Sequence, residues 1–439
     1  MMRPYSIIFV LLLIITNPNL IKTISTQINR QEVINSLKAN EIDLTLVGFY
    51  IPEDGLGKIV QCIADMLEGE AQINWRTTRD VRPNTIGIDQ HMYNVITNPS
   101  DEDGKIAILT DLIWIPSHDQ YSSIPKNSFI KMAYSMLECT AIPQEWVQSL
   151  NDGFDAVIVP DPWLVNVYKN SGVNIPIFTL PLGVHIQEFL SNPLKLNPSE
   201  VFTFGNTSGS WIHKNQVLLI DAFAHAFGNN PKVKLVINSR GCDPKICSLV
   251  YQAIEKWNLK NIEFNVNSLS RQEYVKLLCS FNAYVSLSKG EGYAIIPREA
   301  MAAGIPTILS NNTAHTTLCQ SGLGYSVNSN LLEPADYGYF KNPHAYFYNC
   351  DLSDAVNALL EVYNNYKSFL EKASHAREWV KRYSIDAPIL KSRYKSLIKP
   401  TYIRLEDSNR IEPKGIITSD KKLYNKYKLL IESTQVAAS

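Results

Sequence analysis

The sequence lacks an excess of charge of either sign. Its 439 residues carry 41 basic and 42 acidic side chains, which leaves a formal net charge of -1 at neutral pH. Proteins that bind nucleic acid usually show a basic excess, because they must neutralise phosphates. The charge balance therefore argues against nucleic acid as a partner.

A disulfide framework is missing too. The chain has 7 cysteines, an odd number spread along its length, whereas disulfide-rich domains carry an even number at close spacing. The closest pair, Cys242 and Cys247, has no second Cys or His pair beside it, so a zinc site is not indicated. Because free cysteine is commonly a small core residue, we expect inert buried thiols.

A long apolar run is also absent. The run at residues 6–16 has 11 uncharged residues, fewer than the roughly 20 that a membrane-spanning helix needs. This length suits the apolar centre of a signal peptide, with Thr23 and Ser25 as a poor cleavage site. Extended through Leu20 and Ile21, the run would instead suit a shallow membrane anchor. Both interpretations stay open.

The composition is that of a globular protein, 45% apolar and 19% charged, and the chain is long enough for two domains. After a polar, helical connector at Ile28–Asn40, we expect a buried strand at Leu44–Phe49, a glycine loop at Glu53–Gly57 and an amphipathic helix at Lys58–Leu67. This unit is typical of the start of a doubly wound α/β domain. Further strands are expected at residues 105–109, 156–159 and 176–180.

The strand and helix pattern is interrupted at residues 191–200, where proline and polar residues predict a linker. A second series follows, including a helix opened by Ser270 and Glu273 as a capping box. A lysine-rich helix near the end should dock on the body in preference to a membrane. The predicted organisation is an apolar segment and connector at 1–42, Rossmann-like domains at 43–195 and 196–380, a closing helix at 381–400 and a tail at 401–439.

The most informative segment is LSKGEGYAIIPREAMAAGIPTIL, residues 287–309. We expect a strand to end at Ser288 and a short helix to begin at Pro297 and to stop at Gly304. Glu291 then lies at the carboxyl end of a parallel strand, where open α/β sheets bind ligands, and Glu299 lies in the adjacent first helical turn. Both carboxylates can face one crevice.

A pair of carboxylates suits a ligand rich in vicinal hydroxyls, because each carboxylate accepts several hydrogen bonds. Gly292 lets the backbone approach the ligand, and the free N–H groups of the helix can bind a phosphate. A nucleotide sugar combines these features. The alternative is that Glu299 only complements the helix dipole and that Glu291 is a loop charge. For either glutamate alone this alternative is the stronger one.

The segment EGYAIIPREAMAAGIPTI resembles the E-x7-E motif of retaining glycosyltransferases of the family 4 type. The resemblance covers most of residues 44–398, through segments that begin at Ala133, Gly172 and His213. It implies a GT-B-like α/β fold, in which two Rossmann-like domains face each other across a crevice. The first domain would bind the acceptor and the second the nucleotide-sugar donor.

Carried over by position, the resemblance implies that Glu299 holds the donor ribose and that Glu291 holds the hydroxyls of the transferred sugar. Lys214 would contact the diphosphate and, with Glu291, form the catalytic pair. Gly292 and Tyr293 would complete the donor-binding set.

His213 stands where the family pattern usually has arginine. A neutral imidazole stabilises a diphosphate less than a guanidinium does. Three explanations stay open: His213 is protonated beside the phosphates, another cation such as Arg240 or Lys289 substitutes for it, or catalysis is weak.

In the first domain, the backbone at Gly55 and Gly57 would approach donor phosphate or sugar, although a plain tight turn is an equally good interpretation. His118 is a candidate sugar or acceptor contact, while a lone histidine is more often a surface or core residue. The resemblance also implies transfer with retention, without a metal, and with no cofactor beyond the nucleotide-sugar co-substrate.

We therefore expect a hexosyltransferase whose partners are a nucleotide-sugar donor, an unknown glycan, lipid or protein acceptor, and a membrane surface. A nucleotide-sugar epimerase or phosphorylase on the same fold, or a non-catalytic nucleotide-sugar binding protein, are the alternatives. The glycosylation sequons at Asn206 and Asn311 are predicted on loops at the crevice, where a glycan would obstruct the site. This favours a cytoplasmic enzyme held at a membrane by its N-terminus over the secretory pathway.

Overall fold

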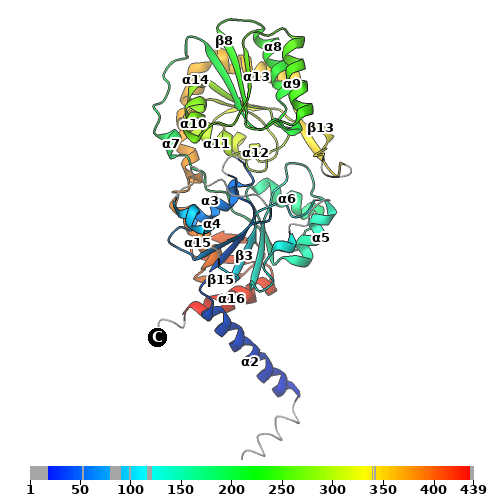
Figure 1. Cartoon of the computed structure of the whole chain (residues 1–439), viewed down its shortest axis with the longest axis vertical. Helices are drawn as coiled ribbons and strands as arrows, with labels where there is room; N and C mark the ends of the chain where they lie inside the picture. Colours follow the sequence, from blue (N-terminus) through cyan, green and yellow to red (C-terminus); the bar gives the residue numbers. More distant parts are fainter. Residues whose placement is uncertain are drawn as a thin grey trace, which may run out of the picture.

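The computed structural model describes residues 18–51, 54–79, 90–97, 100–115, 121–338, 340 and 343–435. His118 and the apolar run at 6–16 lie outside these ranges. Figure 1 shows two lobes stacked along the long axis of the molecule, each built around one twisted sheet. The α/β class and the two Rossmann-like sheets that the sequence predicted are confirmed.

The first lobe contains a sheet of 6 parallel strands in the order β2-β1-β3-β4-β5-β6. Strands β1, β3 and β5 are buried at every position, as expected for parallel strands that are covered on both faces. The strands are β1 (Leu44–Val47), β2 (Ile73–Arg76), β3 (Ile106–Leu109), β4 (Ile130–Tyr134), β5 (Ala156–Val159) and β6 (Ile177–Thr179). The helices are α3 (Lys58–Met66), α4 (Gln90–Thr97), η1 (Tyr121–Ser123), α5 (Gln144–Gly153) and α6 (Pro162–Ser171).

The second lobe has a sheet of the same size and kind, in the order β12-β11-β10-β7-β8-β9. The predicted capping box of Ser270 and Glu273 is confirmed at the start of α10. The strands are β7 (Phe202–Thr207), β8 (Val233–Ser239), β9 (Ile262–Val266), β10 (Ala283–Ser286), β11 (Thr307–Ser310) and β12 (Tyr325–Val327). The helices are η2 (Ile212–Lys214), α8 (Gln216–Phe227), α9 (Pro244–Lys256), α10 (Arg271–Ser280), α11 (Ile295–Ala302), α12 (His315–Cys319), α13 (Leu352–Asn364), α14 (Tyr366–Val380) and η3 (Lys381–Tyr383).

The end of the chain returns to the first lobe, where Figure 1 shows it in orange and red, with the red part at the base of the lobe. Tyr394, Ile416 and Tyr427 are buried in the same apolar cluster as Leu44 and Ile59 of the first lobe. The predicted docking of the last helix on the body is confirmed, whereas the three short strands before it were not predicted. These elements are α15 (Pro388–Ile398), β15 (Tyr402–Leu405), β16 (Arg410–Glu412), β17 (Gly415–Thr418) and α16 (Lys421–Gln435).

Two further helices are α7 and α2. Helix α7 (Gln187–Leu190) precedes the segment at 191–200, which contains no regular helix or strand. Helix α2 (Pro18–Ala39) contacts α16 and projects from the base of the first lobe (Figure 1). Among the described residues, no helix is both long enough and apolar enough to cross a membrane.

An arm of the second lobe, residues 331–349, reaches the first lobe. Phe347 of the arm is buried in one apolar cluster with Trp146 of α5. The backbone N–H of Thr140 in the first lobe donates to the Tyr346 carbonyl at 3.0 Å. The arm therefore joins the two lobes, and the sequence analysis did not predict it. Its two antiparallel strands are β13 (Leu331–Pro334) and β14 (Tyr346–Asn349).

The expectation of inert buried thiols is wrong for Cys242 and Cys247. They form a disulfide, with Cα atoms 5.9 Å apart, which joins Cys242 on the turn after β8 to Cys247 near the start of α9. Both side chains are only half-buried. The spacing in sequence could not reveal this, because the turn geometry decides whether two cysteines come within bonding reach. The other 5 cysteines are free.

The Asn206 sequon is not on a loop, which corrects the expectation from the sequence. Asn206 lies in β7, is 2% exposed, and its side-chain N–H donates to the Val285 carbonyl at 2.7 Å. A glycan cannot be attached there in the folded protein. Asn311 follows β11 and is exposed, as predicted.

We expect the double variant Cys242→Ser, Cys247→Ser to unfold at a lower urea concentration than the wild type. Closing so short a loop stabilises a protein by about 2 kcal/mol through the unfolded state. Cys279→Ser is the matched control, because Cys279 is a free, half-buried cysteine. A thiol count on the denatured, unreduced protein should give 5, rising to 7 after reduction. A count of 7 before reduction would contradict the disulfide.

Candidate active site

Strand β10 carries Glu291 to the carboxyl edge of the second sheet. The strand ends at Ser286, and α11 begins at Ile295, two residues before the predicted start at Pro297. The helix starts earlier because Ala294 adopts a left-handed backbone conformation (φ 59°) that turns the chain directly into it. Pro297 still lies in the first turn, where its missing N–H costs no helical hydrogen bond.

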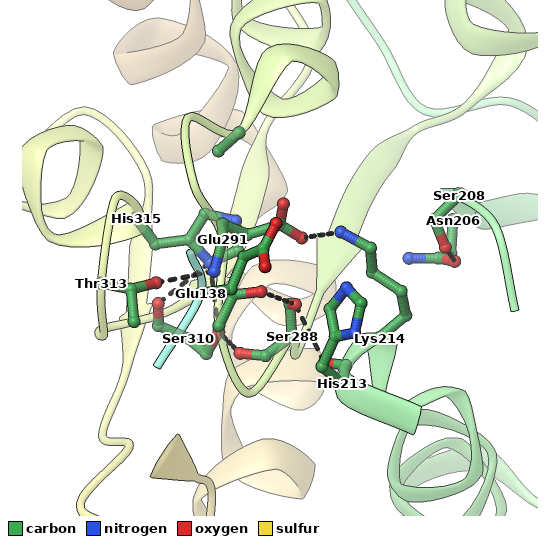
Figure 2. Close-up of polar contacts among 12 residues, drawn as sticks. Glu138, Asn206, Ser208, His213, Lys214, Ser288, Glu291, Ser310, Thr313 and His315 are labelled. Atoms are coloured by element: carbon green, nitrogen blue, oxygen red, sulfur yellow. Dashed lines mark hydrogen bonds and ion pairs between the residues drawn. The ribbon is translucent and has the colours of Figure 1, made fainter. Parts of the chain in front are cut away.

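Glu291 and Lys214 form an ion pair at this edge (Figure 2). Lys214 Nζ lies 2.7 Å from Glu291 Oε1, and the two side chains are 18% and 14% exposed. The Glu291 N–H donates to Thr313 Oγ1 at 2.8 Å, which fixes the loop backbone. Burial raises the pKa of Glu291, but Lys214 and His315 outweigh burial and bring it down to about 2. Glu291 is therefore ionised at neutral pH.

Glu299 is almost completely buried, with 3% exposure. Arg271 Nη1 lies 3.0 Å from one carboxylate oxygen, and the Tyr274 hydroxyl donates to the other at 2.5 Å. Arg271 Nη2 also donates to the His185 carbonyl at 2.9 Å, in the segment that connects the lobes. Neither glutamate of the motif points into bulk solvent, and each has its own cation.

Lys58, the first residue of α3, brings the first lobe close to this network. Burial lowers the pKa of Lys58, the negative charge of Glu299 opposes this effect, and the positive charges of Arg271 and Arg240 reinforce it. The start of α3 thus faces the Glu299 carboxylate and, with Arg271 and Arg240, contributes to a group of three cations. Such a group can bind an anion with several negative oxygens.

The glycine loop before α3 is a tight turn in which two backbone N–H groups donate hydrogen bonds within the loop. Asp54 Oδ1 accepts the backbone N–H groups of Leu56 and Gly57, each at 2.9 Å. Gly57 is buried against the backbone of its own loop, where a Cβ would lie 2.8 Å from a main-chain nitrogen. A Cβ on Gly55 would lie 3.8 Å from Arg240 Nη2, so Arg240 of the second lobe lies opposite this loop.

His213 is neutral in this structure. Burial lowers its pKa, and the adjacent Lys214 adds to the effect, so that the pKa falls to about 3. Its ring lies beside Tyr337 and Phe347 of the arm, with centroids 6.2 Å and 6.1 Å away. A protonated His213 beside phosphates does not agree with this packing.

The two substitute cations named from the sequence differ in their surroundings. Lys289 is 11% exposed and pairs with Glu333 of the arm. Arg240 is exposed and faces the Gly55 loop. Arg240 is therefore the better placed of the two to meet a ligand that binds beside the Gly55 loop.

Gly292 and Tyr293 lie where the two lobes pack together. A Cβ on Gly292 would lie 2.7 Å from Met136 Sδ of the first lobe. The Tyr293 hydroxyl donates to the Leu182 carbonyl at 2.7 Å, and Arg298 lies over its ring, 3.8 Å from the centroid. The Tyr293 hydroxyl is thus directed at the interlobe connection and not at the Lys214–Glu291 pair.

Sequence reasoning did not single out Lys58, Glu138, Arg271 or Tyr274. A signal existed for two of them, because Arg271 and Tyr274 are the first and fourth residues of α10, directly after its predicted cap Ser270. Their pairing with Glu299 is a contact between distant segments, which a local pattern does not show. In the described part of the chain, no group of three or more His, Cys, Asp or Glu side chains could hold a metal ion.

Comparison with known families concerns the second lobe. Residues 202–335 match the family described as "Glycosyl transferases group 1". The matched region contains Lys214, Glu291 and Glu299, and its boundaries include all 6 strands of the second sheet.

Two curated relatives match at low identity. The GDP-mannose:cellobiosyl-diphosphopolyprenol alpha-mannosyltransferase of Xanthomonas campestris is 25% identical over 154 residues, which are 35% of this chain and 40% of the relative. The protein of the same name from Xanthomonas oryzae is 24% identical over 219 residues, 50% of this chain and 53% of the relative. The matches thus span only about half, or less, of the length of these relatives.

Two solved structures share the fold of this chain. Sucrose-phosphate synthase from Thermosynechococcus elongatus gives a TM-score of 0.61 at 13% identity and covers 81% of this chain and 97% of that one. Anabaena HepE in complex with UDP-glucose gives a TM-score of 0.56 at 13% identity and covers 80% of this chain and 98% of that one. The two facing lobes are the GT-B fold, and the predicted fold class is confirmed.

We expect Glu291→Gln to have a lower free energy of unfolding than the wild type at pH 7. This difference should shrink as the pH falls from 4.5, the ordinary pKa of glutamate, toward about 2, the pKa of Glu291 in the folded protein. The folded-state pKa is lowered, so the ionised carboxylate stabilises the fold above the unfolded pKa and loses this effect in acid. Urea denaturation of both proteins at several pH values measures the difference in unfolding free energy. Glu371→Gln, on an exposed position of α14, is the control. A deficit independent of pH would contradict the prediction.

Proposed function

We propose that this chain is a retaining, metal-independent glycosyltransferase that moves a hexose from a nucleotide-sugar donor to an acceptor hydroxyl. The observation that carries the proposal is the Lys214–Glu291 ion pair at the carboxyl edge of β10, inside the region that matches the group 1 glycosyl transferases. The edge of a parallel sheet is where this class of fold binds its ligands. The facing first lobe would present the acceptor.

The proposed roles follow from charge and hydrogen-bonding capacity. Lys214 would stabilise the negative charge that develops on the leaving diphosphate, where a fixed cation acts strongly because water is excluded. Glu291 would accept hydrogen bonds from the transferred sugar. Glu299 would accept the ribose hydroxyls, since a carboxylate has about four acceptor sites and Arg271 and Tyr274 occupy two directions.

We propose that another cation of the second lobe replaces the missing arginine. His213 is neutral, so it cannot act as the second cation that a diphosphate requires. We infer that Arg240, opposite the Gly55 loop, takes this role. Lys58 at the start of α3 would add positive potential from the first lobe.

The acceptor is proposed from the relatives alone. Both Xanthomonas proteins are named for a polyprenol-linked diphosphosaccharide acceptor and GDP-mannose as donor, and HepE was solved with UDP-glucose. We propose a lipid-linked saccharide as the first acceptor to test. The donor screen should contain both nucleotides.

A non-catalytic nucleotide-sugar binding protein is the second candidate, and the neutral His213 favours it. Such a protein would retain the crevice and bind donor without turnover. A donor screen by thermal shift followed by a nucleotide-release assay separates the two candidates.

We expect nucleotide release with at least one donor, and a loss of about 100-fold or more in turnover in Lys214→Met and Glu291→Gln. Lys367→Met, which changes an exposed lysine of α14, should keep wild-type turnover. Retention is read from the anomeric configuration of the product. Saturable donor binding without release from any donor would establish the binding protein instead.

We propose a cytoplasmic location at a membrane surface, because activated sugars are supplied there and the exposed Asn311 sequon would put a glycan beside the site. The Cys242–Cys247 disulfide favours the secretory alternative, since disulfides persist in oxidising compartments. A reporter fused behind residue 40 tests the proposal. Retention inside the cell is expected, and export would overturn it.

A further inference from the structure

Glu138 is an acidic residue of the first lobe that lies against the catalytic pair of the second. It follows the carboxyl end of β4. A Cβ on Gly290 would lie 1.9 Å from the Glu138 carbonyl oxygen, so the absence of a side chain at Gly290 lets the two backbones touch. Figure 2 shows the Glu138 side chain beside Glu291, with Lys214 reaching the same group of oxygens.

The arm holds Glu138 in this position. The Tyr337 hydroxyl accepts the Glu138 backbone N–H at 3.1 Å and donates to the carboxylate Oε2 at 3.3 Å. The Tyr337 ring lies beside that of His213, the residue before Lys214. Two segments far from Glu138 in sequence therefore hold it: the Gly290 loop packs on its backbone, and Tyr337 of the arm bonds both its N–H and its carboxylate.

The ionisable groups around Glu138 come from every element packed on it. Lys214 and Glu291 face it from the second lobe, Tyr337 from the arm and Tyr168 from α6, and Cys139 is its neighbour in the chain. Burial raises the pKa of Glu138, and the negative charge of Glu291 adds to this, while Lys214 and Tyr337 oppose it. The result is a carboxyl that takes up a proton at a higher pH than an exposed glutamate does.

Charge balance then couples this carboxyl to an anionic ligand. With all three groups ionised, Lys214 faces two carboxylates, and a diphosphate placed beside Lys214 would add more negative charge to the same space. Protonation of Glu138 removes one of the two competing carboxylates and makes its oxygen a hydrogen-bond donor. An anion that binds here must therefore favour the protonated form.

We propose that Glu138 belongs to the donor site and that its carboxylate takes up one proton from solvent when the diphosphate of a nucleotide sugar binds beside Lys214. The proposal rests on the proposed function, because that function places the diphosphate at Lys214. It adds a residue of the acceptor-side lobe, and Tyr337 as the residue that positions it, to the Lys214–Glu291 pair of the donor-side lobe. Donor affinity would consequently fall as the pH rises.

The test is calorimetric titration of UDP-glucose and GDP-mannose into the full chain, in buffers that differ in ionisation enthalpy. The diphosphate bridge of a nucleotide sugar does not itself titrate near neutral pH, so any proton taken up belongs to the protein. We expect the wild type to bind up to about one proton per ligand, with affinity falling by as much as about tenfold per pH unit. Glu138→Gln should bind the ligand with no proton uptake and with an affinity independent of pH.

Two further variants test whether the proton uptake belongs to Glu138. Glu145→Gln, an exposed glutamate in the same lobe, should take up protons as the wild type does. Tyr337→Phe removes a hydrogen bond that lowers the pKa of Glu138, so the pH of maximal proton uptake should move upward. Binding without proton uptake in the wild type, or equal uptake in Glu138→Gln, would overturn this proposal alone. No binding of either nucleotide sugar by any variant would overturn the proposed donor site with it.

Discussion

The contact between the two lobes is the constraint on which the rest of the site depends. At Gly290 the chain of the second lobe touches the backbone of the first, with no room for a Cβ. A buried ion pair crosses the same interface: Arg298 Nη2 lies 3.9 Å from Asp161 Oδ2, and both side chains are 1% exposed. Burying two charges is costly unless they stay together, so this pair penalises any arrangement that separates the lobes. Lys214 and Glu291 thus act in a site whose walls come from both lobes.

The arrangement of charge follows from this packing. Each motif glutamate has a cation of its own, Lys214 for Glu291 at 2.7 Å and Arg271 for Glu299 at 3.0 Å. Arg271 also donates to a carbonyl of the connecting segment. The donor site and the connection between the lobes therefore share a residue, so that a change at one affects the geometry of the other.

The elements of the fold could largely be predicted from sequence, because several parallel strands are short buried apolar runs and some helix starts carry a local cap. The capping box at Ser270 and the strand at Ala156–Val159 are examples. The partners of the site residues could not be predicted in this way. Arg271 meets Glu299 only after α10 and α11 have packed on the same sheet edge, and the arm reaches the first lobe through Phe347, which carries no local signal. His213 was recognised as a departure from the family pattern, but its neutrality depends on burial under Tyr337, a contact made across more than a hundred residues of chain.

The return of the chain end to the first lobe has a consequence for biosynthesis. The ribosome synthesises residues 388–435 after both sheets, yet Tyr394, Ile416 and Tyr427 fill the interior shared with Leu44 and Ile59 of the first lobe. The second sheet, by contrast, is encoded within one uninterrupted stretch. During translation the later half can consequently acquire its native packing first, while the earlier half waits, with exposed apolar surface, for its final helices to emerge.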